Sequence, residues 1–573
     1  MLSKQVVERV QAWVNSSIDN TDKEQLKKML EQSDPLLEEG FYKDLEFGTG
    51  GLRGIMGLGT NFINKYTISI ATQGLANYIN QVFQGKDNAV AIAHDSRNNS
   101  RFFAEVAAQV FAANQIKVYL FDDLRPTPEL SFAVRYLKCQ AGVVITASHN
   151  PPEYNGYKVY WEDGAQVTPP HDKNIIQEVA KVGTYDNVKT QFNSENIIII
   201  GEKIDEEYLK KTISLAYLPT HENKQTKVVY TPLHGTGIKL IPKAFEYCKY
   251  SYTVVKEQES PDGNFPTVSS PNPEEASAME LAQKQAEQQN ADIFIGTDPD
   301  TDRVGAGIKI SDGKYMLLNG NQAASLLVYY NLLQRKNKGL LQGNEFVAKT
   351  IVTTDLIKKI CDDFHVECYE TLTGFKYIAE LIRKFEGKKK FICGGEESYG
   401  YLVGDYVRDK DAVVSALFLT EITEWAKRQN KTLLDVLLDI YEKYGFYYEK
   451  LLSITKKGIK GAEEIASMMS RLRENPPQAF GTDKIVKIID YQSGIVYENG
   501  KETGKTGLPK SNVLQFNTQN GTSFTARPSG TEPKIKFYFR IRIPGFSKQQ
   551  YFEYQDKAEE KVKEIIKELN LKN

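Results

Sequence analysis

Short apolar runs rich in β-branched residues recur along this chain, and each is followed by a polar or glycine-rich loop and then by a segment of helical character. Five such runs lie at residues 89–93, 143–145, 293–295, 390–393 and 524–526. Short strands that alternate with helix-length segments are typical of α/β layers built on parallel or mixed sheets. Because ligands in such folds bind beyond the carboxyl ends of the strands, we expect the functional residues in the loops after these runs.

Five other segments have a recognisable pattern. Residues 310–320 are typical of a hairpin that leads into a helix over 322–335, while 412–428 and 547–571 show the periodicity of long helices. The N-terminal segment has apolar residues separated by charges, which predicts an amphipathic helix and not the continuous apolar core of a signal peptide. Its apolar positions are Val6, Val7, Val10, Trp13 and Val14.

The composition is that of a globular protein. A chain of 573 residues has room for about three to five domains, and 41% hydrophobic with 25% charged residues excludes a disordered or collagen-like chain. Lys and Arg total 72 against 74 Asp and Glu, so no overall basic field would hold nucleic acid or an anionic membrane surface. No stretch approaches the ~20 apolar residues of a membrane span.

Cysteine and histidine are sparse. Five cysteines and six histidines are spread over the chain, and no two cysteines form a C-x-x-C pair, which supports neither a zinc ribbon nor a disulfide framework. Isolated cysteines are typical of buried thiols in a reducing compartment. We therefore expect a soluble, cytoplasmic protein with no nucleic-acid or membrane partner.

The first candidate site is the loop Thr146-Ala147-Ser148-His149-Asn150-Pro151, which follows an apolar strand. Proline prevents the strand from continuing, so Ser148 is presented by a loop. A serine hydroxyl needs a base or a metal ion to act as a nucleophile, and His149 is adjacent. Because adjacent side chains on an extended segment diverge, His149 is not required to be that base.

The second candidate site has three carboxylates at alternate positions, Asp298, Asp300 and Asp302, again after an apolar strand. Three acids in one loop repel one another unless a cation neutralises them, and an oxygen-rich set suits Mg²⁺. An EF-hand is excluded because Arg303 stands where glycine is required and Lys309 stands where glutamate is required. The spacing therefore predicts a magnesium site of another kind.

A competing interpretation uses the same residues. Residues 300–304 fit the D-x-D-x-V pattern of haloacid-dehalogenase-like phosphatases, in which the first aspartate accepts the phosphoryl group. Asp300 would then be a nucleophile and not a metal ligand. This interpretation leaves Asp298 and the other polar loops without a role, and we keep it as the alternative.

Two later loops have the composition of ligand-binding loops. Residues 394–400, GGEESYG, offer glutamate and serine side chains that suit the hydroxyl groups of a sugar. Residues 527–534, RPSGTEPK, combine an arginine, two hydroxyl residues and a glycine, and that set suits a phosphate group.

Taken together and in this order, the four loops resemble those of the α-D-phosphohexomutase superfamily, in particular its phosphoglucomutases. The resemblance covers roughly residues 45–540. Supporting matches to the same superfamily are FGTGGLRG (47–54), HDSR (94–97), YTPLHGTG (230–237), TLTGFK (371–376) and RDKD (408–411).

The resemblance implies an α/β fold of four domains around a central cleft. Three similar mixed-sheet α/β domains would be followed by a smaller α+β domain at the C-terminus. An N-terminal helical extension would precede them. The expected boundaries are 1–45 for the extension, 46–200 for the phosphoserine domain, 201–318 for the metal-binding domain, 319–435 for the sugar-recognition domain and 436–573 for the phosphate-binding domain.

The resemblance also implies roles for particular side chains. Ser148 would carry the phosphoryl group and share Mg²⁺ with Asp298, Asp300 and Asp302. The other implied catalytic residues are Lys410, Lys158, His149 and Arg53. The implied substrate-binding residues are Glu396 and Ser398 for the sugar hydroxyls, Arg303 and Lys376 along the substrate site, and Arg527, Ser529, Gly530 and Thr531 for the phosphate that is not transferred.

The activity implied by the resemblance is reversible conversion of glucose 1-phosphate and glucose 6-phosphate. It would proceed through a phosphoserine enzyme, with glucose 1,6-bisphosphate as intermediate and activator. The sugar loop is closer to the glucose type than to the GEMS type, so glucose is favoured, while phosphomannomutase and phosphopentomutase activities remain alternatives. The expected partners are small sugar phosphates, and the protein would be a monomer or a homodimer.

Overall fold

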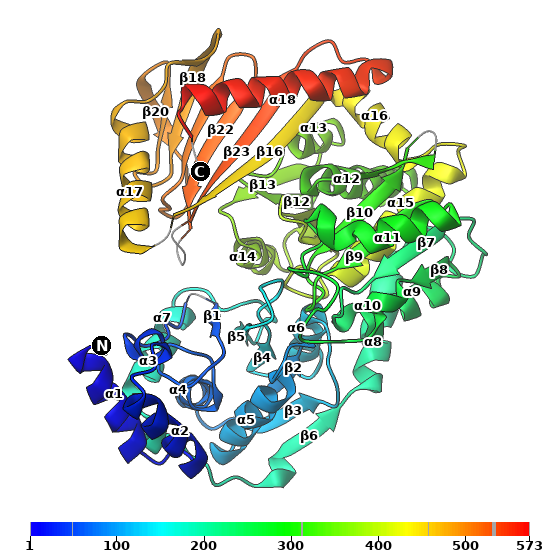
Figure 1. Cartoon of the computed structure of the whole chain (residues 1–573). Coiled ribbons are helices and arrows are strands. Elements are labelled where there is room, and N and C mark those ends of the chain that lie inside the picture. Colours follow the sequence, from blue (N-terminus) through cyan, green and yellow to red (C-terminus); the bar gives the residue numbers. More distant parts are fainter. Residues whose placement is uncertain (1, 49, 311–312, 457, 530–533, 572–573) are drawn as a thin grey trace. The chain divides into compact units, whose positions relative to one another are not determined.

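The computed structural model describes residues 2–48, 50–310, 313–456, 458–529 and 534–571 (Figure 1). The chain divides into two compact units. The first unit comprises Met1–Asn319, Ala379–Ile392 and Ser398–Arg428. The second comprises Gly320–Ile378, Cys393–Glu397 and Gln429–Asn573.

A six-stranded mixed sheet forms the centre of the first part of the first unit, in the order β1-β5-β4-β2-β3-β6. The strands are β1 (Gly51–Ile55), β2 (Ala89–His94), β3 (Lys117–Phe121), β4 (Ala141–Ile145), β5 (Tyr154–Trp161) and β6 (Ile197–Ile200). Every residue of β2 and β4 is buried, and the two strands pair in parallel. Central parallel strands read as continuous apolar runs because both of their faces are covered.

The helices of this layer are α4 (Lys65–Val82), α5 (Ser100–Ala113), α6 (Thr127–Tyr136) and α7 (His171–Val182). A single apolar cluster joins α4 and α5 to the sheet and includes Ile79, Phe103 and Val143. The edge strand β1 pairs with β5 in antiparallel fashion, and β5 also runs antiparallel to β4. The loop after β4 therefore lies beside the strand that carries Lys158.

A five-stranded sheet forms the second layer of the first unit, in the order β11-β10-β9-β7-β8. Its strands are β7 (Lys227–Thr231), β8 (Ser251–Val254), β9 (Ile293–Thr297), β10 (Val304–Lys309) and β11 (Tyr315–Leu317). Its helices are α8 (Glu202–Ile213), α9 (Ile241–Tyr247), α10 (Lys256–Glu259) and α11 (Ala276–Gln289). The predicted hairpin near residues 310–320 is confirmed, since Lys309 pairs with Tyr315 in antiparallel register.

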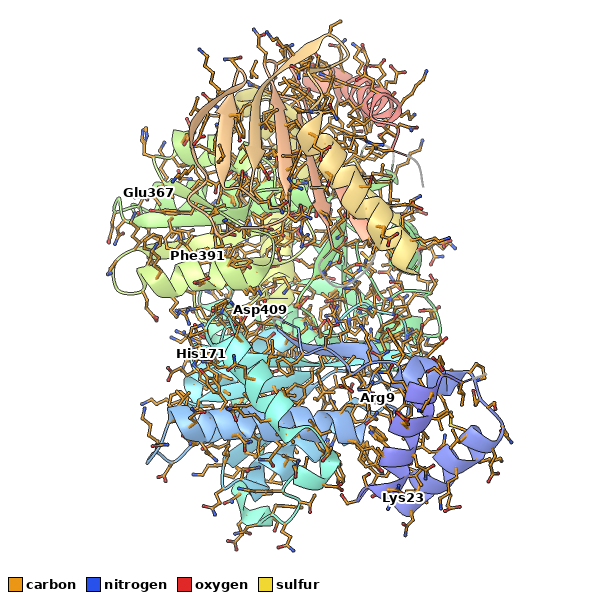
Figure 2. All side chains as sticks on the ribbon, turned by 90° about the vertical axis from the view of Figure 1, so that its left-hand side faces the viewer. Arg9, Lys23, His171, Glu367, Phe391 and Asp409 are labelled. Atoms are coloured by element: carbon orange, nitrogen blue, oxygen red, sulfur yellow. The ribbon has the colours of Figure 1, made fainter. Side chains whose placement is uncertain are left out.

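Three N-terminal helices pack on α4: α1 (Lys4–Asn15), α2 (Asn20–Glu31) and α3 (Leu36–Phe41). The predicted amphipathic helix is confirmed as α1, which buries Val6, Val10 and Val14 against Tyr66 of α4. Figure 2 labels Arg9 and Lys23 on α1 and α2. Arg9 donates a hydrogen bond of 2.8 Å to the carbonyl of Phe41, which ties α1 to α3.

The segment that returns to the first unit carries β15 (Tyr401–Val403) and α15 (Ala412–Lys427). The long helix predicted over 412–428 is thus confirmed. Asp411 caps it, because its carboxylate accepts hydrogen bonds from the amides of Val413 and Val414. Helix α14 (Phe375–Phe385) and strand β14 (Lys390–Gly395) each contain residues of both units.

The second unit begins with α12 (Gly320–Asn337), β12 (Glu345–Thr350), α13 (Leu356–Asp363) and β13 (Glu367–Thr371), and β12 and β13 are parallel. Helix α16 (Leu433–Tyr444) leads into an eight-stranded sheet whose main order is β16-β23-β22-β21-β18-β19-β20. The strands are β16 (Phe446–Thr455), β17 (Ala479–Phe480), β18 (Asp483–Asp490), β19 (Ile495–Glu498), β20 (Lys501–Lys505), β21 (Leu514–Thr518), β22 (Ser523–Pro528) and β23 (Lys534–Ile543).

Neighbouring strands of this last sheet are antiparallel, and they are accompanied by α17 (Gly458–Glu474) and α18 (Tyr551–Glu568). The predicted terminal helix begins at Tyr551, four residues later than expected, because residues 548–550 form a 3₁₀ turn. Mixed α/β sheets followed by an α+β C-terminal region confirm the predicted fold class, and all five apolar runs are strands: β2, β4, β9, β14 and β22.

Candidate functional site

Ser148 stands in a tight turn directly after β4. Its backbone has a φ of 53°, in the left-handed region, and its amide donates a hydrogen bond of 2.8 Å to the Thr146 hydroxyl. The side chain is 3% exposed. Its hydroxyl donates a hydrogen bond of 2.7 Å to Oδ2 of Asp298, which belongs to the loop after β9. The turn thus presents the Ser148 hydroxyl to the acidic loop.

The expectation that Ser148 and His149 diverge is wrong. Ser148 Oγ and His149 Nδ1 are 3.2 Å apart, because the left-handed turn replaces the extended conformation that was assumed. Burial, with the nearby charges of Arg303 and Arg53, lowers the pKa of His149 well below its ordinary value. Neutral His149 therefore has one ring nitrogen within hydrogen-bond distance of the hydroxyl.

Arg97 holds the Ser148 loop in place through hydrogen bonds to its backbone carbonyl groups. It is 3% exposed, and its guanidinium donates to the carbonyl oxygens of Ser148 at 2.6 Å and Pro151 at 2.8 Å, and also to that of Asn150. Asp95 forms an ion pair with Arg97 at 3.4 Å. Both residues belong to the HDSR motif, whose match to the superfamily is visible in the sequence although its role as the support of the loop is not.

The three aspartates lie in the turn between β9 and β10, and all are buried. One carboxylate oxygen from each can be chosen so that the three lie within 4.8 Å of one another. Thr301 adopts a φ of 56°, and its hydroxyl is 2.7 Å from the hydroxyl of Thr236. Residues at alternate positions of an extended segment share a side, and this turn gathers the three carboxylates further.

Two carboxylate oxygens of the triad accept no hydrogen bond from any described residue and are suited to bind a divalent cation. Asp298 Oδ1 is already used, since it accepts from the amides of Asp302 at 3.1 Å and Arg303 at 3.0 Å. In the described part of the chain, Oδ1 of Asp300 and Oδ1 of Asp302 are buried and have no hydrogen-bond partner. Hard oxygen ligands that carry net negative charge are what Mg²⁺ or a similar ion requires. The triad could therefore hold a metal ion.

Two lysines reach the same carboxylates. Lys158 Nζ, on β5, is 2.6 Å from Asp300 Oδ2 and 3.1 Å from Asp302 Oδ2. Lys410 Nζ is 3.2 Å from Asp302 Oδ2 and 2.9 Å from Asp409 Oδ1. Asp409, labelled in Figure 2, in turn accepts a hydrogen bond of 2.7 Å from the Tyr160 hydroxyl. Both lysines predicted from the resemblance thus lie beside the acidic triad.

The electrostatics of the triad are uneven. Burial raises the pKa of Asp298 well above its ordinary value, and the charges of Asp300 and Asp302 reinforce this. Burial also acts to raise the pKa of Asp302, but the charges of Lys158, Lys410 and Arg303 outweigh it and lower that pKa. The environment therefore disfavours the charged form of Asp298 and favours the charged form of Asp302.

Thr127 is a contact of the triad that the sequence reasoning missed. It is fully buried as the first residue of α6, and its hydroxyl donates to Asp300 Oδ2 at 3.0 Å. Its amide donates to the Asp300 carbonyl at 2.9 Å, which places the N-terminus of α6 against the acidic loop. The sequence signal was a threonine before proline at a helix start, in Arg125-Pro126-Thr127-Pro128. Nothing in that signal indicates a partner 173 residues away.

The remaining predicted residues of the first unit are Arg53, Arg303 and Ser398. Arg53 on β1 donates to the Asn150 side chain at 3.1 Å and so contacts the Ser148 loop. Arg303 is half-buried and forms an ion pair with Glu274. Ser398 is half-buried in the segment that joins β14 to β15.

The other predicted substrate-binding residues belong to the second unit. Glu396 is 8% exposed and accepts a hydrogen bond of 2.8 Å from the Gly374 amide, and Lys376 lies in the first turn of α14. Arg527, at the end of β22, donates to the Tyr538 hydroxyl at 3.3 Å. The Ser529 amide donates to the Lys534 carbonyl at 2.7 Å. The predicted residues Gly530 and Thr531 lie outside the described residues.

Comparisons with known proteins find similar proteins over most of the chain. The chain matches three consecutive family domains, described as phosphoglucomutase/phosphomannomutase α/β/α domains I, II and III, over residues 44–186, 206–309 and 319–444. The phosphoglucomutase of Staphylococcus aureus strain MRSA252 is 37% identical over 540 residues, which cover 93% of this chain and 96% of that protein. The phosphoglucomutase of Staphylococcus haemolyticus is 37% identical over 524 residues, which cover 90% of this chain and 93% of that protein.

Solved structures show the same fold. A phosphoglucomutase/phosphomannomutase family protein from Burkholderia thailandensis has a TM-score of 0.65 at 15% identity, over 92% of this chain and 97% of that one. Parafusin, a phosphoglucomutase from Paramecium in its open form, has a TM-score of 0.65 at 18% identity. The match covers 91% of this chain and 96% of that one.

The fold and the sequence matches together define the class as phosphohexomutase, an enzyme that transfers a phosphoryl group within a sugar phosphate. Within that class, the chain belongs to the phosphoglucomutase/phosphomannomutase family. The resemblance found in the sequence is confirmed, and the alternative of a haloacid-dehalogenase-like phosphatase is not favoured. Among the described helices, none has both the length and the apolar character needed to cross a bilayer.

Proposed function

We propose that this protein is a phosphoglucomutase that interconverts glucose 1-phosphate and glucose 6-phosphate, a reaction of glucose metabolism. The observation that carries the proposal is the placement of the Ser148 hydroxyl, which is buried and 2.7 Å from a carboxylate of the acidic triad. The 37% identity to staphylococcal phosphoglucomutases supports glucose as the sugar. Mannose and pentose phosphates are the less favoured substrates.

Ser148 is the proposed carrier of the phosphoryl group. The bond between Ser148 Oγ and phosphorus breaks while a bond forms from that phosphorus to the free hydroxyl oxygen of the sugar phosphate, whose proton passes to a base. The product, glucose 1,6-bisphosphate, turns over in the site and returns its other phosphoryl group to Ser148. The sugar oxygen that loses phosphorus takes up a proton, so the atoms balance over one cycle.

Lys158 and Lys410 are the proposed proton-transfer groups, because both side-chain nitrogens lie within 3.2 Å of Asp302 Oδ2, beside the acidic triad. The lysine that accepts the sugar proton must do so as a neutral amine. His149 and Arg53 are proposed to position the Ser148 loop through their contacts with Ser148 and Asn150. Alanine variants of the two lysines would separate their roles. The variant that removes the base should lower kcat at unchanged KM.

We propose Mg²⁺ as the metal ion, held by Asp298, Asp300 and Asp302 together with Ser148 once the serine carries phosphate. When bound, the ion would polarise the transferring phosphoryl group and offset part of its negative charge. The two buried carboxylate oxygens without a hydrogen-bond partner in the described chain support this assignment.

The remaining assignments of substrate contacts follow the side-chain chemistry. Glu396 and Ser398 are proposed to bind the sugar hydroxyls, and Arg303 and Lys376 to line the substrate site. Arg527, Ser529, Gly530 and Thr531 are proposed to bind the phosphate that is not transferred. Substituting Arg527 with alanine should then raise KM more than it lowers kcat.

The test is a coupled assay that detects the 6-phosphate product from the 1-phosphates of glucose, mannose and glucosamine and the 5-phosphate product from ribose 1-phosphate, each with and without glucose 1,6-bisphosphate. We expect glucose 1-phosphate to be the best substrate and the bisphosphate to stimulate the reaction. Radiolabelled phosphate should enter the protein at Ser148 and resist hydroxylamine. Release of inorganic phosphate with a hydroxylamine-labile label would instead identify an aspartyl phosphatase and overturn the proposal.

Further parts of the proposal concern organisation in the cell and in solution. We propose a cytoplasmic protein that is a monomer or a homodimer, with domains bounded at 1–45, 46–200, 201–318, 319–435 and 436–573. Cell fractionation, light scattering of the purified protein and limited proteolysis at the proposed boundaries test these three points.

A further inference from the structure

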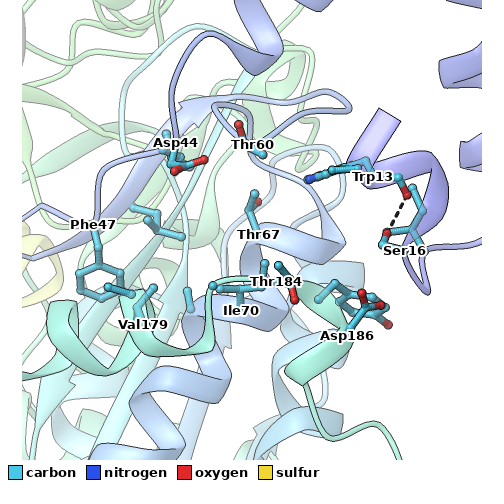
Figure 3. A pocket seen from close by; sticks show the side chains of 18 of the residues that line it. Trp13, Ser16, Asp44, Phe47, Thr60, Thr67, Ile70, Val179, Thr184 and Asp186 are labelled. Carbon is cyan, nitrogen blue, oxygen red and sulfur yellow. Dashed lines mark hydrogen bonds between the residues drawn. The ribbon is translucent and has the colours of Figure 1, made fainter. Parts of the chain in front are cut away.

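A cavity of about 400 Å³ lies in the first unit between helix α1 and the six-stranded sheet layer (Figure 3). Its walls come from α1, the segment 44–47, β1, α4, α7 and residues 183–186. The matched family domain I begins at residue 44, so α1 lies outside that match. Helix α1 nevertheless supplies Ala12 and Trp13 to the wall of the cavity.

The body of the cavity is apolar. Phe47, Leu52, Ile70 and Val179 are among the side chains that form its walls. None of the described residues that line it is a lysine, an arginine or a histidine. A sugar phosphate needs cationic or amide donors and would have to leave water for an apolar surface, so this cavity does not suit one. Pockets of about 300–1,000 Å³ with apolar walls and a few polar groups are typical of sites for small organic ligands.

Two carboxylates stand at opposite sides of the cavity, Asp44 and Asp186 (Figure 3). Asp44 is paired with Arg9. Asp186 accepts a hydrogen bond of 2.6 Å from the Ser17 amide, and the hydrogen bonds from Ser17 lower the pKa of Asp186. Asp186 is therefore an ionised carboxylate at neutral pH. It provides the wall with an acceptor for a cationic group.

Trp13 adds a donor and an aromatic surface. In Figure 3 its indole nitrogen is turned into the cavity. Its ring packs edge-on against Phe41 and Tyr66, with centroids 5.3 and 5.4 Å apart, so it is held in place. A held aromatic ring beside an apolar wall suits a flat ligand.

We propose that this cavity binds a small, largely apolar organic molecule that carries an amino group. The apolar body of the ligand would lie against Leu52, Ile70 and Val179, and its ammonium group would face Asp186. The site is separate from the Ser148 centre, and the proposal does not depend on the phosphoglucomutase assignment. It also gives helix α1 a role, since its residues Ala12 and Trp13 form part of the wall.

The test uses the full chain and two probes that share a ring and differ in charge, tryptamine and indole-3-propionate, in calorimetric titrations. We expect tryptamine to bind at one site with a Kd below about 1 mM, and indole-3-propionate to bind at least about tenfold more weakly. Absence of saturable tryptamine binding overturns the proposal. Equal binding of the two probes overturns the assignment of an amino ligand.

Variants locate the site. Ala180→Phe fills the cavity from an exposed position on α7 and should weaken tryptamine binding about tenfold, and Asp186→Asn should weaken it about fivefold. Gln177→Ala, also exposed on α7 but outside the cavity lining, is the matched control and should bind as the wild type does. If Ala180→Phe does not fold, Ala12→Leu blocks the cavity from α1. Unchanged binding in a folded blocking variant contradicts the assigned location.

Discussion

The hydroxyl of Ser148 donates a hydrogen bond of 2.7 Å to Oδ2 of Asp298, although the two residues are 150 positions apart in the sequence. The contact joins the loop after β4 of one sheet to the loop after β9 of another. It brings a nucleophilic group to a set of buried acids that could hold a metal ion. Substitution of Ser148 should therefore remove the carrier of the phosphoryl group, whereas substitution of an aspartate of the triad should weaken binding of the metal ion.

Ser148→Ala should abolish mutase activity, by at least about 10³-fold, while the fold stays intact. The substitution removes the oxygen that carries the phosphoryl group, but it leaves no buried charge behind. The coupled assay measures the activity and thermal unfolding measures the fold. Ser214→Ala, at the end of α8, is the control and should retain activity. A folded Ser148→Ala protein with normal turnover contradicts the role.

Removal of divalent cations should stop the reaction and lower the thermal unfolding temperature. The triad could hold a metal ion and has two buried carboxylate oxygens without a hydrogen-bond partner in the described chain, and an ion that binds only the folded state stabilises it. We expect chelation to abolish activity and added Mg²⁺ to restore both quantities. Asp302→Asn should lose the stabilisation by Mg²⁺. An Asp302→Asn protein stabilised as strongly as the wild type would show that the ion binds elsewhere.

Thr127→Val should weaken the response to Mg²⁺ because it removes the hydroxyl that orients Asp300 and keeps the volume of the side chain. A hydrogen bond to a charged acceptor contributes about 1.5–3 kcal/mol, so the Mg²⁺ concentration for half-maximal activity should rise roughly tenfold. Thr127→Ser keeps the hydroxyl and should behave like the wild type. Equal Mg²⁺ dependence in Thr127→Val and Thr127→Ser would exclude this positioning role.

Arg97→Met should destabilise the first unit by about 3–5 kcal/mol, because it leaves Asp95 buried without its ion-pair partner. It also removes the donors to the carbonyls of the Ser148 loop, so activity should fall as well. The double variant Asp95→Asn, Arg97→Met should recover part of the stability but not the activity. Denaturant unfolding and the coupled assay measure the two effects, and additive stability losses would contradict the coupling.

We expect the free energy of unfolding of the second unit to depend on pH because of Glu449, which lies on β16. Burial raises its pKa to about 7, against the opposing effects of the Thr354 hydrogen bond and the Arg540 charge. The folded protein thus binds this proton more tightly than the unfolded chain does. The contribution of Glu449 to the free energy of unfolding is fully present below about pH 4.5 and is lost as the pH rises to about 7. The free energy of unfolding therefore falls by at most about 3 kcal/mol over this range because of this group.

Glu449→Gln keeps the shape of the side chain and cannot ionise, so the variant should gain stability relative to the wild type between about pH 5 and pH 8 by up to about 3 kcal/mol. Denaturant unfolding of both proteins at a series of pH values measures the difference, and effects shared by other groups cancel in the comparison. A difference that does not change with pH would show that Glu449 does not titrate in this range.

The local elements and the chemical classes of the loops can be read from the order of the amino acids alone. The apolar runs at 89–93 and 143–145 are strands because a buried parallel strand needs apolar residues on both faces, which is visible in a few consecutive letters. The spacing of Val6, Val10 and Val14 predicts α1 in the same way. The three aspartates of residues 298–302 indicate a metal site because their repulsion is a local property.

The tertiary structure alone determines which loops come into contact, and no local sequence pattern indicates it. The contacts of Thr127 with Asp300 and of Lys158 with the acidic triad depend on strand pairing and on the packing of one layer against another. The local sequence does not indicate that His149 lies beside the Ser148 hydroxyl, because the left-handed turn at Ser148 is held by contacts to Thr146 and Arg97 and not by a residue type that favours it. Long-range contacts of this kind exist only once the chain has folded, since each partner is supplied by a different element.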